Sequence, residues 1–411
     1  MKILFISNLY PPVVFGGYEK LCSLIADKFS ERGHDVTVLT SDYGGEADYN
    51  PGVFRELKLL ANEDDIYKEC KMSQEEIQFV GENNVGVCRK VIDEQKPDIV
   101  FVWNLYFLNK NFIEFLITSE EKVVFFLSDN WLASSFNVDF VVDYFDKLSA
   151  PRLKKDRLVS FFKRSLSGSK MTACQIGQRA IFSSDYMREF YGLAGLSFTE
   201  STTIYNGINF SNIDVGKIVP RGGLSNNGEV KLLFAGRIVH IKGVHVLLES
   251  LKLLISKYGV NNFRLTIMGD VSDKDYYQYL EGRIRDLGLE EFVTIKAPVK
   301  EEDLCEEFQK YDIHIFPSLY EPFSLTLIYA LACGIPSVVS KAGGNEEIAI
   351  DNETALLYDP FDTKGLADRI LKLINDGDLR NRLSQNSQVF AKRFNMEGMV
   401  DSIEKYFIDL K

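Results

Sequence analysis

The sequence predicts an α/β protein with two domains, each a doubly wound parallel sheet. Short, nearly all-apolar runs alternate with longer amphipathic stretches along the whole chain, which is typical of buried parallel strands joined by helices. The alternation is interrupted at 211–229, where Gly, Asn, Ser and Pro predominate, and then restarts. A length of 411 residues is also too great for one compact core. We therefore expect two Rossmann-like domains.

The first half of the chain contains the strands and helices of the first domain. A helix with apolar positions spaced three and four apart should end near Gly33, since glycine is common just after a helix C-terminus. These apolar positions are Leu21, Leu24, Ile25 and Phe29. Strands are predicted at 2–7, 35–40, 98–103, 122–128 and 180–184. The charge-rich stretch 55–95 is predicted to be mostly helical.

The second half repeats the pattern. Strands are predicted at 229–236, 263–270, 292–298, 312–318, 335–340 and 354–359, with a helix at 244–258. The predicted organisation is an N-terminal domain at 1–210, a linker at 211–229, a second domain at 230–385 and a C-terminal helix at 386–411. Whether that helix returns to the first domain is left open.

Composition and charge exclude several classes of protein. The formal net charge of −12 argues against nucleic-acid partners, which usually require a basic surface. The six cysteines form no CxxC pair and the four histidines show no ligand spacing, so no metal site is expected. The start of the chain is interpreted as a strand rather than a signal peptide, and no window is long and apolar enough to span a bilayer. We expect a cytoplasmic protein, with peripheral contact at the inner face of the membrane left open.

One basic segment, 152–164, allows two interpretations. It is favoured as a solvated helix face. The alternative is a positive stripe that faces anionic lipid headgroups or an anionic acceptor.

Two loops that follow predicted strands contain residues suited to binding phosphate. Gly16 and Gly17 precede the first helix, where glycine permits close backbone approach and free amides attract anions, although a simple turn would also use them. In the second domain, Arg237 and Lys242 follow a strand directly. Their guanidinium and ammonium groups could together neutralise a pyrophosphate.

The strongest signal is the loop 317–325, between a buried strand and a helix. Glu321 is placed there to accept hydrogen bonds from sugar hydroxyls, or alternatively to act only as a charge partner of the helix start. The amides of Phe323, Ser324 and Leu325 open that helix and form a candidate anion site.

Together these segments resemble the large family of retaining glycosyltransferases that includes sucrose-phosphate synthases and many bacterial polysaccharide transferases, family four in the usual classification. The segments that carry the resemblance are 10–40, 204–209, 234–250, 268–270 and 316–348. The resemblance implies the GT-B fold and a UDP-, GDP- or ADP-sugar donor, with a UDP-sugar favoured. It implies transfer with retention of configuration and without a metal cofactor.

The resemblance also implies roles for individual residues. Arg237 and Lys242 match the family's diphosphate-binding pair, and Gly16 and Gly17 match its phosphate-approaching loop. Glu321 matches the first acid of a Glu-x7-Glu motif that touches the donor sugar. The amides of Phe323, Ser324 and Leu325 match the backbone site for sugar and phosphate.

The sequence departs from the family pattern at two places. Tyr329 stands eight residues after Glu321, where most members carry a second Glu that holds the ribose hydroxyls. One tyrosine hydroxyl could still bond a ribose. Ser128-Asp129 stands where many members have His-Asp. Asp129 is expected either to orient or deprotonate an acceptor hydroxyl or to act as a cap, with Trp103 and Asn104 lining the same side.

The predicted function is transfer of a hexose-type sugar from a nucleotide diphosphate sugar to a glycan, glycolipid or protein acceptor. One alternative is a metal-dependent transferase that uses Asp273-Lys274-Asp275. A second is a non-hydrolysing sugar-nucleotide epimerase, and a third is a non-catalytic sugar-binding or partner subunit.

Overall fold

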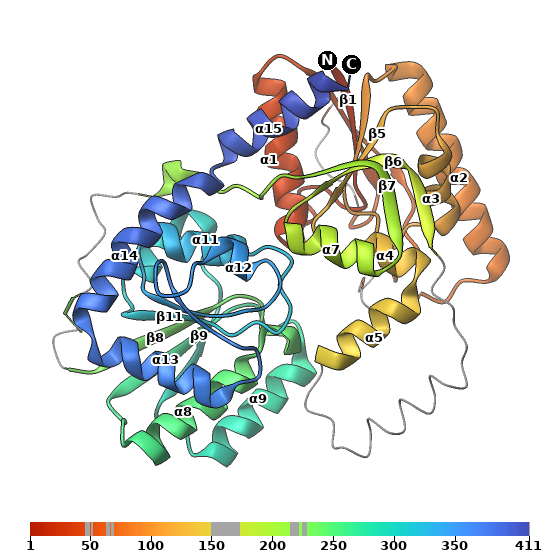
Figure 1. Ribbon diagram of the computed structural model, residues 1–411. Coiled ribbons are helices and arrows are strands. Elements are labelled where there is room, and N and C mark those ends of the chain that lie inside the picture. The colour runs from red at the N-terminus through yellow and green to blue at the C-terminus, as the bar shows by residue number, and fades with distance from the viewer. Residues whose placement is uncertain are drawn as a thin grey trace. The chain divides into compact units, whose positions relative to one another are not determined.

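The computed structural model describes residues 1–45, 50, 52–62, 66, 70–148, 173–213, 222–223 and 228–410. The expected pair of α/β domains is confirmed, because these residues form two compact units, each built around one all-parallel sheet (Figure 1). Of the described residues, unit 1 contains those within 1–145, 173–205 and 400–410, and unit 2 contains those within 146–148 and 206–399. The basic segment 152–164 and most of the predicted linker 211–229 lie outside the described residues.

Unit 1 contains a seven-stranded sheet of order β3-β2-β1-β4-β5-β6-β7. Its strands are β1 (Lys2–Ile6), β2 (Asp35–Ser41), β3 (Val53–Leu57), β4 (Ile99–Val102), β5 (Val123–Leu127), β6 (Cys174–Phe182) and β7 (Leu196–Thr203). Its helices are α1 (Gly17–Glu31), α2 (Gln74–Gln95), α3 (Lys110–Thr118), α4 (Trp131–Phe136), α5 (Val138–Leu148) and α7 (Asp185–Leu193). The strand order reverses between β1 and β4, and such switch points form the binding crevices of open α/β sheets.

Alternate residues of β1 supply the two faces of this sheet. Leu4 and Ile6 join an apolar cluster with residues of α2 and α3. Phe5 faces the other side, where its ring centroid lies 6.3 Å from that of Phe29 on α1. Phe407, from the end of α15 (Met396–Asp409), lies 5.8 Å from Phe29 on the same side. The C-terminal part of α15 therefore belongs to the core of unit 1, and the division between the units falls within this helix.

Unit 2 contains a six-stranded sheet of order β10-β9-β8-β11-β12-β13. Its strands are β8 (Val230–Ala235), β9 (Phe263–Met268), β10 (Val293–Lys296), β11 (Ile313–Phe316), β12 (Ser337–Ser340) and β13 (Leu356–Tyr358). Its α-helices are α8 (Val244–Tyr258), α9 (Lys274–Leu287), α10 (Leu304–Phe308), α11 (Leu325–Ala332), α12 (Asn345–Ile348), α13 (Thr363–Asn375) and α14 (Gly377–Ala391). Its 3-10 turns are η1 (Phe210–Asn212), η3 (His240–Lys242), η4 (Glu301–Asp303) and η5 (Lys392–Phe394).

The core of unit 2 lies between its sheet and the helices α8, α9 and α13. β8 contributes the fully buried Val230, Leu232 and Phe234, while α8 begins and ends where the sequence predicted. The sheet order again reverses at a central pair, here β8 and β11. The loops that follow these two strands hold Arg237, Lys242 and Glu321.

The structure differs from the sequence predictions at three places. The stretch 55–95 is helical only from Gln74 onward, where α2 begins, and its first residues belong to β3 (Val53–Leu57). Strand β7 was missed, since an edge strand that is largely exposed needs no apolar run. The helix expected at 386–411 is two helices, α14 and α15, separated by η5. Leu24 is also 36% exposed rather than in the core. None of the helices in the described ranges is long and apolar enough to cross a membrane.

Candidate functional site

The loop after β8 is held tightly against the edge of the unit 2 sheet. The side chain of Ile238 is fully buried, and its N–H donates to the Asp270 carbonyl over 3.0 Å. Gly243 has φ +69, and a Cβ at this position would lie 2.0 Å from the carbonyl oxygen of Pro317. A side chain is excluded by both the dihedral and the contact. This close approach joins the loop to the segment that follows β11.

Two of the predicted site residues meet directly. The Nζ atom of Lys242 lies 2.6 Å from Oε2 of Glu321, and their side chains are only 12% and 7% exposed. The ammonium group also lies 5.8 Å from the ring centroid of Phe316. Because the pair is largely shielded from water, the two opposite charges compensate each other locally. Lys242 and Glu321 therefore act as one ion pair rather than as two independent charges.

A third loop, after β12, completes the same edge. The N–H of Gly344 donates to the carbonyl of Glu321 over 2.9 Å. A Cβ on Gly344 would lie 2.2 Å from the carbonyl oxygen of Pro322. The Ser340 hydroxyl donates to the carbonyl of Ser318 over 2.5 Å. The backbone around Glu321 is therefore held from two sides, which leaves little freedom to move the carboxylate.

The start of α11 presents free main-chain donors. Ser324 is the N-cap, and its Oγ accepts the N–H of Leu327 over 3.1 Å. Within the part of the chain that the structure describes, the N–H groups of Ser324 and Leu325 have no acceptor. Phe323 precedes them and is buried, with its ring centroid 5.6 Å from that of Phe394. Free amides at a helix N-terminus attract anions.

Arg237 is the predicted cation whose charge is not compensated. Its side chain is exposed, and no ion pair or hydrogen bond of its guanidinium occurs among the described residues. It follows β8 by two residues and lies in the same loop as Lys242. An uncompensated guanidinium can grip a phosphate with two parallel hydrogen bonds.

The hydroxyl of Tyr329 is already occupied. It donates to Oε1 of Glu301. Burial raises the pKa of Tyr329 well above its ordinary value, and the nearby Glu301 carboxylate raises it further. The hydroxyl therefore stays protonated and acts as a donor to Glu301. Tyr329 therefore has no free hydroxyl proton to donate to a ribose, which is the role expected from the sequence.

The glycine pair of unit 1 behaves differently from the loop of unit 2. Gly16 is the N-cap of α1 and Gly17 is the first helical residue. The backbone at Gly16 is extended, so no positive φ requires glycine there. Its N–H donates to Oε2 of Glu19 over 2.8 Å, and Glu19 is 5% exposed. A carboxylate of the protein already complements this helix start.

Asp129 takes the cap role that the sequence left open. Its Oδ1 accepts the N–H of Trp131 at the start of α4 over 3.0 Å. Tyr191 donates its hydroxyl to the Asp129 carbonyl over 2.9 Å. Burial, and then the charge of Asp129, raise the pKa of Tyr106 to about 12 and that of Tyr18 well above its ordinary value. These phenols stay neutral, and Tyr18 donates its proton to the Phe126 carbonyl and Tyr106 to Oδ1 of Asn130.

Trp103 does not line a sugar site. It is fully buried, with its ring 4.4 Å from that of Phe126 and in edge contact with Phe101. Asn104 is 7% exposed, and its Oδ1 accepts the N–H of Tyr106. The expectation for Trp103 was wrong because a strand-end aromatic can turn into the aromatic core instead of toward solvent.

Sequence reasoning missed a histidine pair beside the Lys242 loop. The rings of His240 and His245 stack at 4.6 Å, and Nδ1 of His245 lies 2.8 Å from the Tyr276 hydroxyl. Burial, followed by His240 and Arg283, lowers the pKa of His245 to about 4. Both rings are thus neutral near pH 7. The spacing of the two histidines in HIKGVH indicates that their rings meet only once the tight turn at Gly243 is known.

The tripeptide proposed for a metal-dependent alternative has a structural role. Asp273 is the N-cap of α9, and its Oδ1 accepts the N–H of Tyr276 over 3.1 Å. Asp275 lies in the first turn of α9. Among the described residues no group of three or more His, Cys, Asp or Glu could hold a metal ion.

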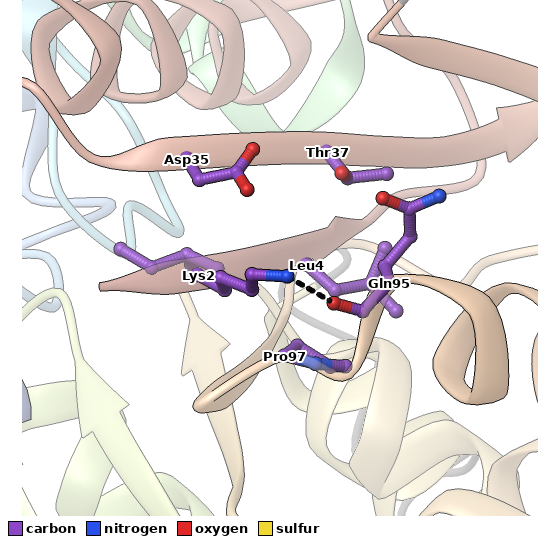
Figure 2. Close-up of a pocket in the computed structure, with 7 residues that line it drawn as sticks. Lys2, Leu4, Asp35, Thr37, Gln95 and Pro97 are labelled. Atoms are coloured by element: carbon purple, nitrogen blue, oxygen red, sulfur yellow. Dashed lines mark hydrogen bonds between the residues drawn. The ribbon is translucent and has the colours of Figure 1, made fainter.

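A hollow lies at the amino-terminal edge of the unit 1 sheet, where β1 and β2 begin (Figure 2). Lys2, Asp35, Thr37, Gln95 and Pro97 line it, and the Lys2 ammonium donates to the Gln95 carbonyl over 3.2 Å. Ligands of open α/β sheets bind at the carboxyl ends of the strands, so this hollow is not a candidate for the chemistry.

Two family models match the chain. The model described as Glycosyltransferase Family 4 matches residues 15–212. The model described as Glycosyl transferases group 1 matches residues 218–390. The matches follow one another and together extend over most of the chain.

Curated relatives resemble part of the chain. The D-inositol 3-phosphate glycosyltransferase of Arthrobacter sp. (strain FB24) is 32% identical over 167 residues, which are 41% of this chain and 39% of that protein. The mannosylfructose-phosphate synthase of Agrobacterium fabrum is 31% identical over 157 residues, or 38% of this chain and 35% of that protein. The chain thus matches only about two fifths of the length of these relatives.

Solved structures share the fold over the full length. Sucrose-phosphate synthase from Thermosynechococcus elongatus superimposes with a TM-score of 0.74 at 18% identity, covering 99% of this chain and 98% of that one. Anabaena Alr3699/HepE, solved in complex with UDP-glucose, gives 0.68 at 20% identity with full coverage of both chains. The fold is that of the GT-B glycosyltransferases, and the models for family 4 and for group 1 match the two halves of the chain. The chain therefore belongs to the GT-B glycosyltransferases that these two models describe.

Proposed function

We propose that this protein transfers a hexose-type sugar from a nucleoside diphosphate sugar, a UDP-sugar in the first instance, to an acceptor hydroxyl with retention of configuration. The observation that supports this most directly is the edge of the unit 2 sheet. There the uncompensated Arg237, the Lys242–Glu321 pair and the free amides of Ser324 and Leu325 follow two neighbouring strands. The relatives named as glycosyltransferases and the Anabaena structure with UDP-glucose agree with it.

The leaving nucleoside diphosphate gains negative charge as the glycosidic bond breaks. Arg237 and the amides at the start of α11 would stabilise that charge as it develops. Lys242 would share its ammonium between the diphosphate and Glu321, whose carboxylate would accept hydroxyls of the donor sugar. Because protein cations and amides supply this stabilisation, the proposed reaction needs no metal cofactor.

The acceptor is proposed to bind unit 1, where Asp129 lies among neutral tyrosine hydroxyls. Since Asp129 also caps α4, its part in the reaction would be to orient the acceptor hydroxyl rather than to move freely. The acceptor would be a glycan, glycolipid or protein. A cytoplasmic location stays a prediction.

A ligand panel tests the proposed function. Unfolding of the protein is followed on heating with UDP, GDP, ADP and dTDP and their sugars, each at high concentration. A bound ligand at 100 times its Kd should stabilise the native state by about 2.7 kcal/mol and raise the melting temperature accordingly. If no member of the panel shifts the melting temperature, the proposal is overturned in favour of a non-catalytic partner subunit.

Product analysis separates the remaining alternatives. The selected donor is incubated with EDTA, with and without candidate acceptors. Transfer that continues in EDTA supports the metal-independent reaction, and loss of all transfer contradicts it. An epimerised sugar nucleotide formed without acceptor would identify the enzyme as an epimerase instead.

A further inference from the structure

A second carboxylate lies at the same edge of unit 2, away from the Lys242–Glu321 pair. Glu301 opens η4, in the loop after β10, and its Oε1 accepts the hydroxyl of Tyr329 on α11. Tyr329 is 3% exposed, whereas Glu301 is partly exposed. The contact joins a buried residue of α11 to a carboxylate that solvent or a ligand can reach.

The two partners have very different capacity for further hydrogen bonds. The Tyr329 hydroxyl has a single proton, and it donates this proton to Glu301. An ionised carboxylate accepts up to about four hydrogen bonds. Within the described residues, Oε2 of Glu301 has no partner, because Lys300 pairs with Glu302 instead. Glu301 therefore offers free acceptors in a fixed position.

The position suits one part of a nucleotide. Tyr329 lies four residues after Leu325, so it stands about 6 Å along the helix from the free amides proposed to bind phosphate. In a nucleoside diphosphate the ribose is joined directly to the diphosphate. A carboxylate repels phosphate oxygens but accepts hydrogen bonds from neutral hydroxyls, and a vicinal diol can donate to both of its oxygens.

We infer that Glu301 is the residue that binds the ribose hydroxyls of the donor nucleotide and that Tyr329 is a positioning residue that holds its carboxylate. This assignment rests on the proposed function, since it needs a nucleoside diphosphate in unit 2. It adds a specificity residue from a different loop, and it explains why a buried tyrosine directs its hydroxyl at a charged side chain. The enzyme should then discriminate ribonucleotides from analogues that lack the ribose diol.

The test compares calorimetric binding of UDP, GDP and ADP with that of their 2′,3′-dideoxy analogues. The wild-type protein should bind the ribonucleotide it prefers at least about tenfold more tightly than the dideoxy analogue, as expected for hydrogen bonds to a charged group. Glu301→Gln should reduce this ratio to about twofold while the affinity for the dideoxy analogue stays the same. The unchanged dideoxy affinity also shows that the variant is folded.

Two further variants complete the experiment. Tyr329→Phe should lower the ratio part of the way without changing dideoxy binding, whereas a purely structural role of Tyr329 would weaken both ligands equally. Glu302→Gln, which alters an exposed neighbouring carboxylate, should keep the full ratio. If Glu301→Gln keeps the wild-type ratio of ribonucleotide to dideoxy affinity, the inference about Glu301 is overturned while the proposed function stands. Failure of the wild-type protein to bind any of the nucleotides would overturn the proposed function itself.

Discussion

The two units place a glycine-containing loop at the same topological position and give it opposite electrostatics. In unit 1 the loop after β1 leads into α1, and the Gly16 amide is taken by the Glu19 carboxylate. In unit 2 the loop after β8 leads into α8 and holds Arg237, with free amides at the neighbouring helix α11. The start of α1 is thus neutralised by a carboxylate of the protein, whereas the amides at the start of α11 remain available to a ligand.

The difference shows that a strand, a glycine loop and a helix do not by themselves make an anion site. A helix N-terminus binds an external anion only if the protein has not already supplied one. The backbone differs as well, because Gly243 has positive φ and a close carbonyl contact, whereas Gly16 is extended and a Cβ there would lie 3.7 Å from the Glu19 carboxylate. The following experiments challenge this contrast, from the largest expected effect to the smallest.

Alanine in place of each glycine should have very different consequences. Gly243→Ala should lower the free energy of unfolding by about 3 kcal/mol and abolish donor binding, because its Cβ would meet the Pro317 carbonyl at a strained dihedral. Gly16→Ala should cost no more than about 1 kcal/mol. Urea denaturation followed by circular dichroism measures both. Equal losses in the two variants would contradict the contrast between the loops.

Removal of the uncompensated cation should impair catalysis without unfolding the protein. Arg237→Ala should lower turnover by about two orders of magnitude, since loss of one preorganised donor costs on the order of 3 kcal/mol in the barrier. Lys20→Ala, an exposed cation in the first turn of α1, is the matched control and should keep wild-type turnover. Steady-state kinetics with the selected donor decide the matter, and full activity of Arg237→Ala would refute the assignment.

Lys242→Ala should lower turnover by a similar factor, but it is a less direct probe. It leaves the buried carboxylate of Glu321 without its partner, and an unpaired buried charge can cost about 3 kcal/mol of stability. The double variant Lys242→Met/Glu321→Leu should recover much of the lost stability while remaining inactive.

Mild acid should destabilise unit 2 before unit 1. Burial lowers the pKa of His245 to about 4 and that of His314 to about 3, whereas an unfolded histidine titrates near 6.5. As the pH falls below 6.5 the unfolded state binds more protons, so each histidine removes up to about 1.4 kcal/mol of stability per pH unit. In unit 1, the lowered pKa of Glu404 preserves its stabilising contribution until more acidic pH.

Two optical probes can separate the units in this experiment. The two tryptophans of the chain, Trp103 and Trp131, both lie in unit 1, so their fluorescence reports that unit alone. At pH 5 the circular dichroism transition in urea should begin at lower denaturant than the fluorescence transition, and at pH 7.5 the two should move closer. His245→Asn should reduce the difference. Transitions that shift equally with pH would contradict the prediction.

The smallest effect is expected at Glu19. Glu19→Ala removes the carboxylate that accepts the Gly16 N–H at the start of α1, which should cost unit 1 about 1 kcal/mol. Tryptophan fluorescence in urea measures the loss. Donor binding should be unaffected, and a strong loss of nucleotide affinity would show that the unit 1 loop takes part in donor binding after all.

Local patterns in the sequence were enough to predict much of this protein. Apolar runs placed most strands of both sheets, and the three-and-four spacing placed α1. The helix predicted at 244–258 matches α8, and the break at 211–229 indicated two domains. Strand ends also indicated where Arg237, Lys242 and Glu321 would lie. Periodicity reports burial, however, so it missed the edge strand β7, whose residues are largely exposed.

Tertiary structure alone decided which side chains meet. Lys242 and Glu321 are 79 residues apart, yet they are in contact because the neighbouring strands β8 and β11 bring their loops together. Tyr329 on α11 and Glu301 in the loop after the edge strand β10 are 28 residues apart and are also in contact. Trp103 turned into the core and Glu19 turned onto the Gly16 amide for reasons of packing and hydrogen bonding that no local pattern records. The sequence determined the elements and the order of the loops. Packing determined which charges are compensated and which remain free for a ligand.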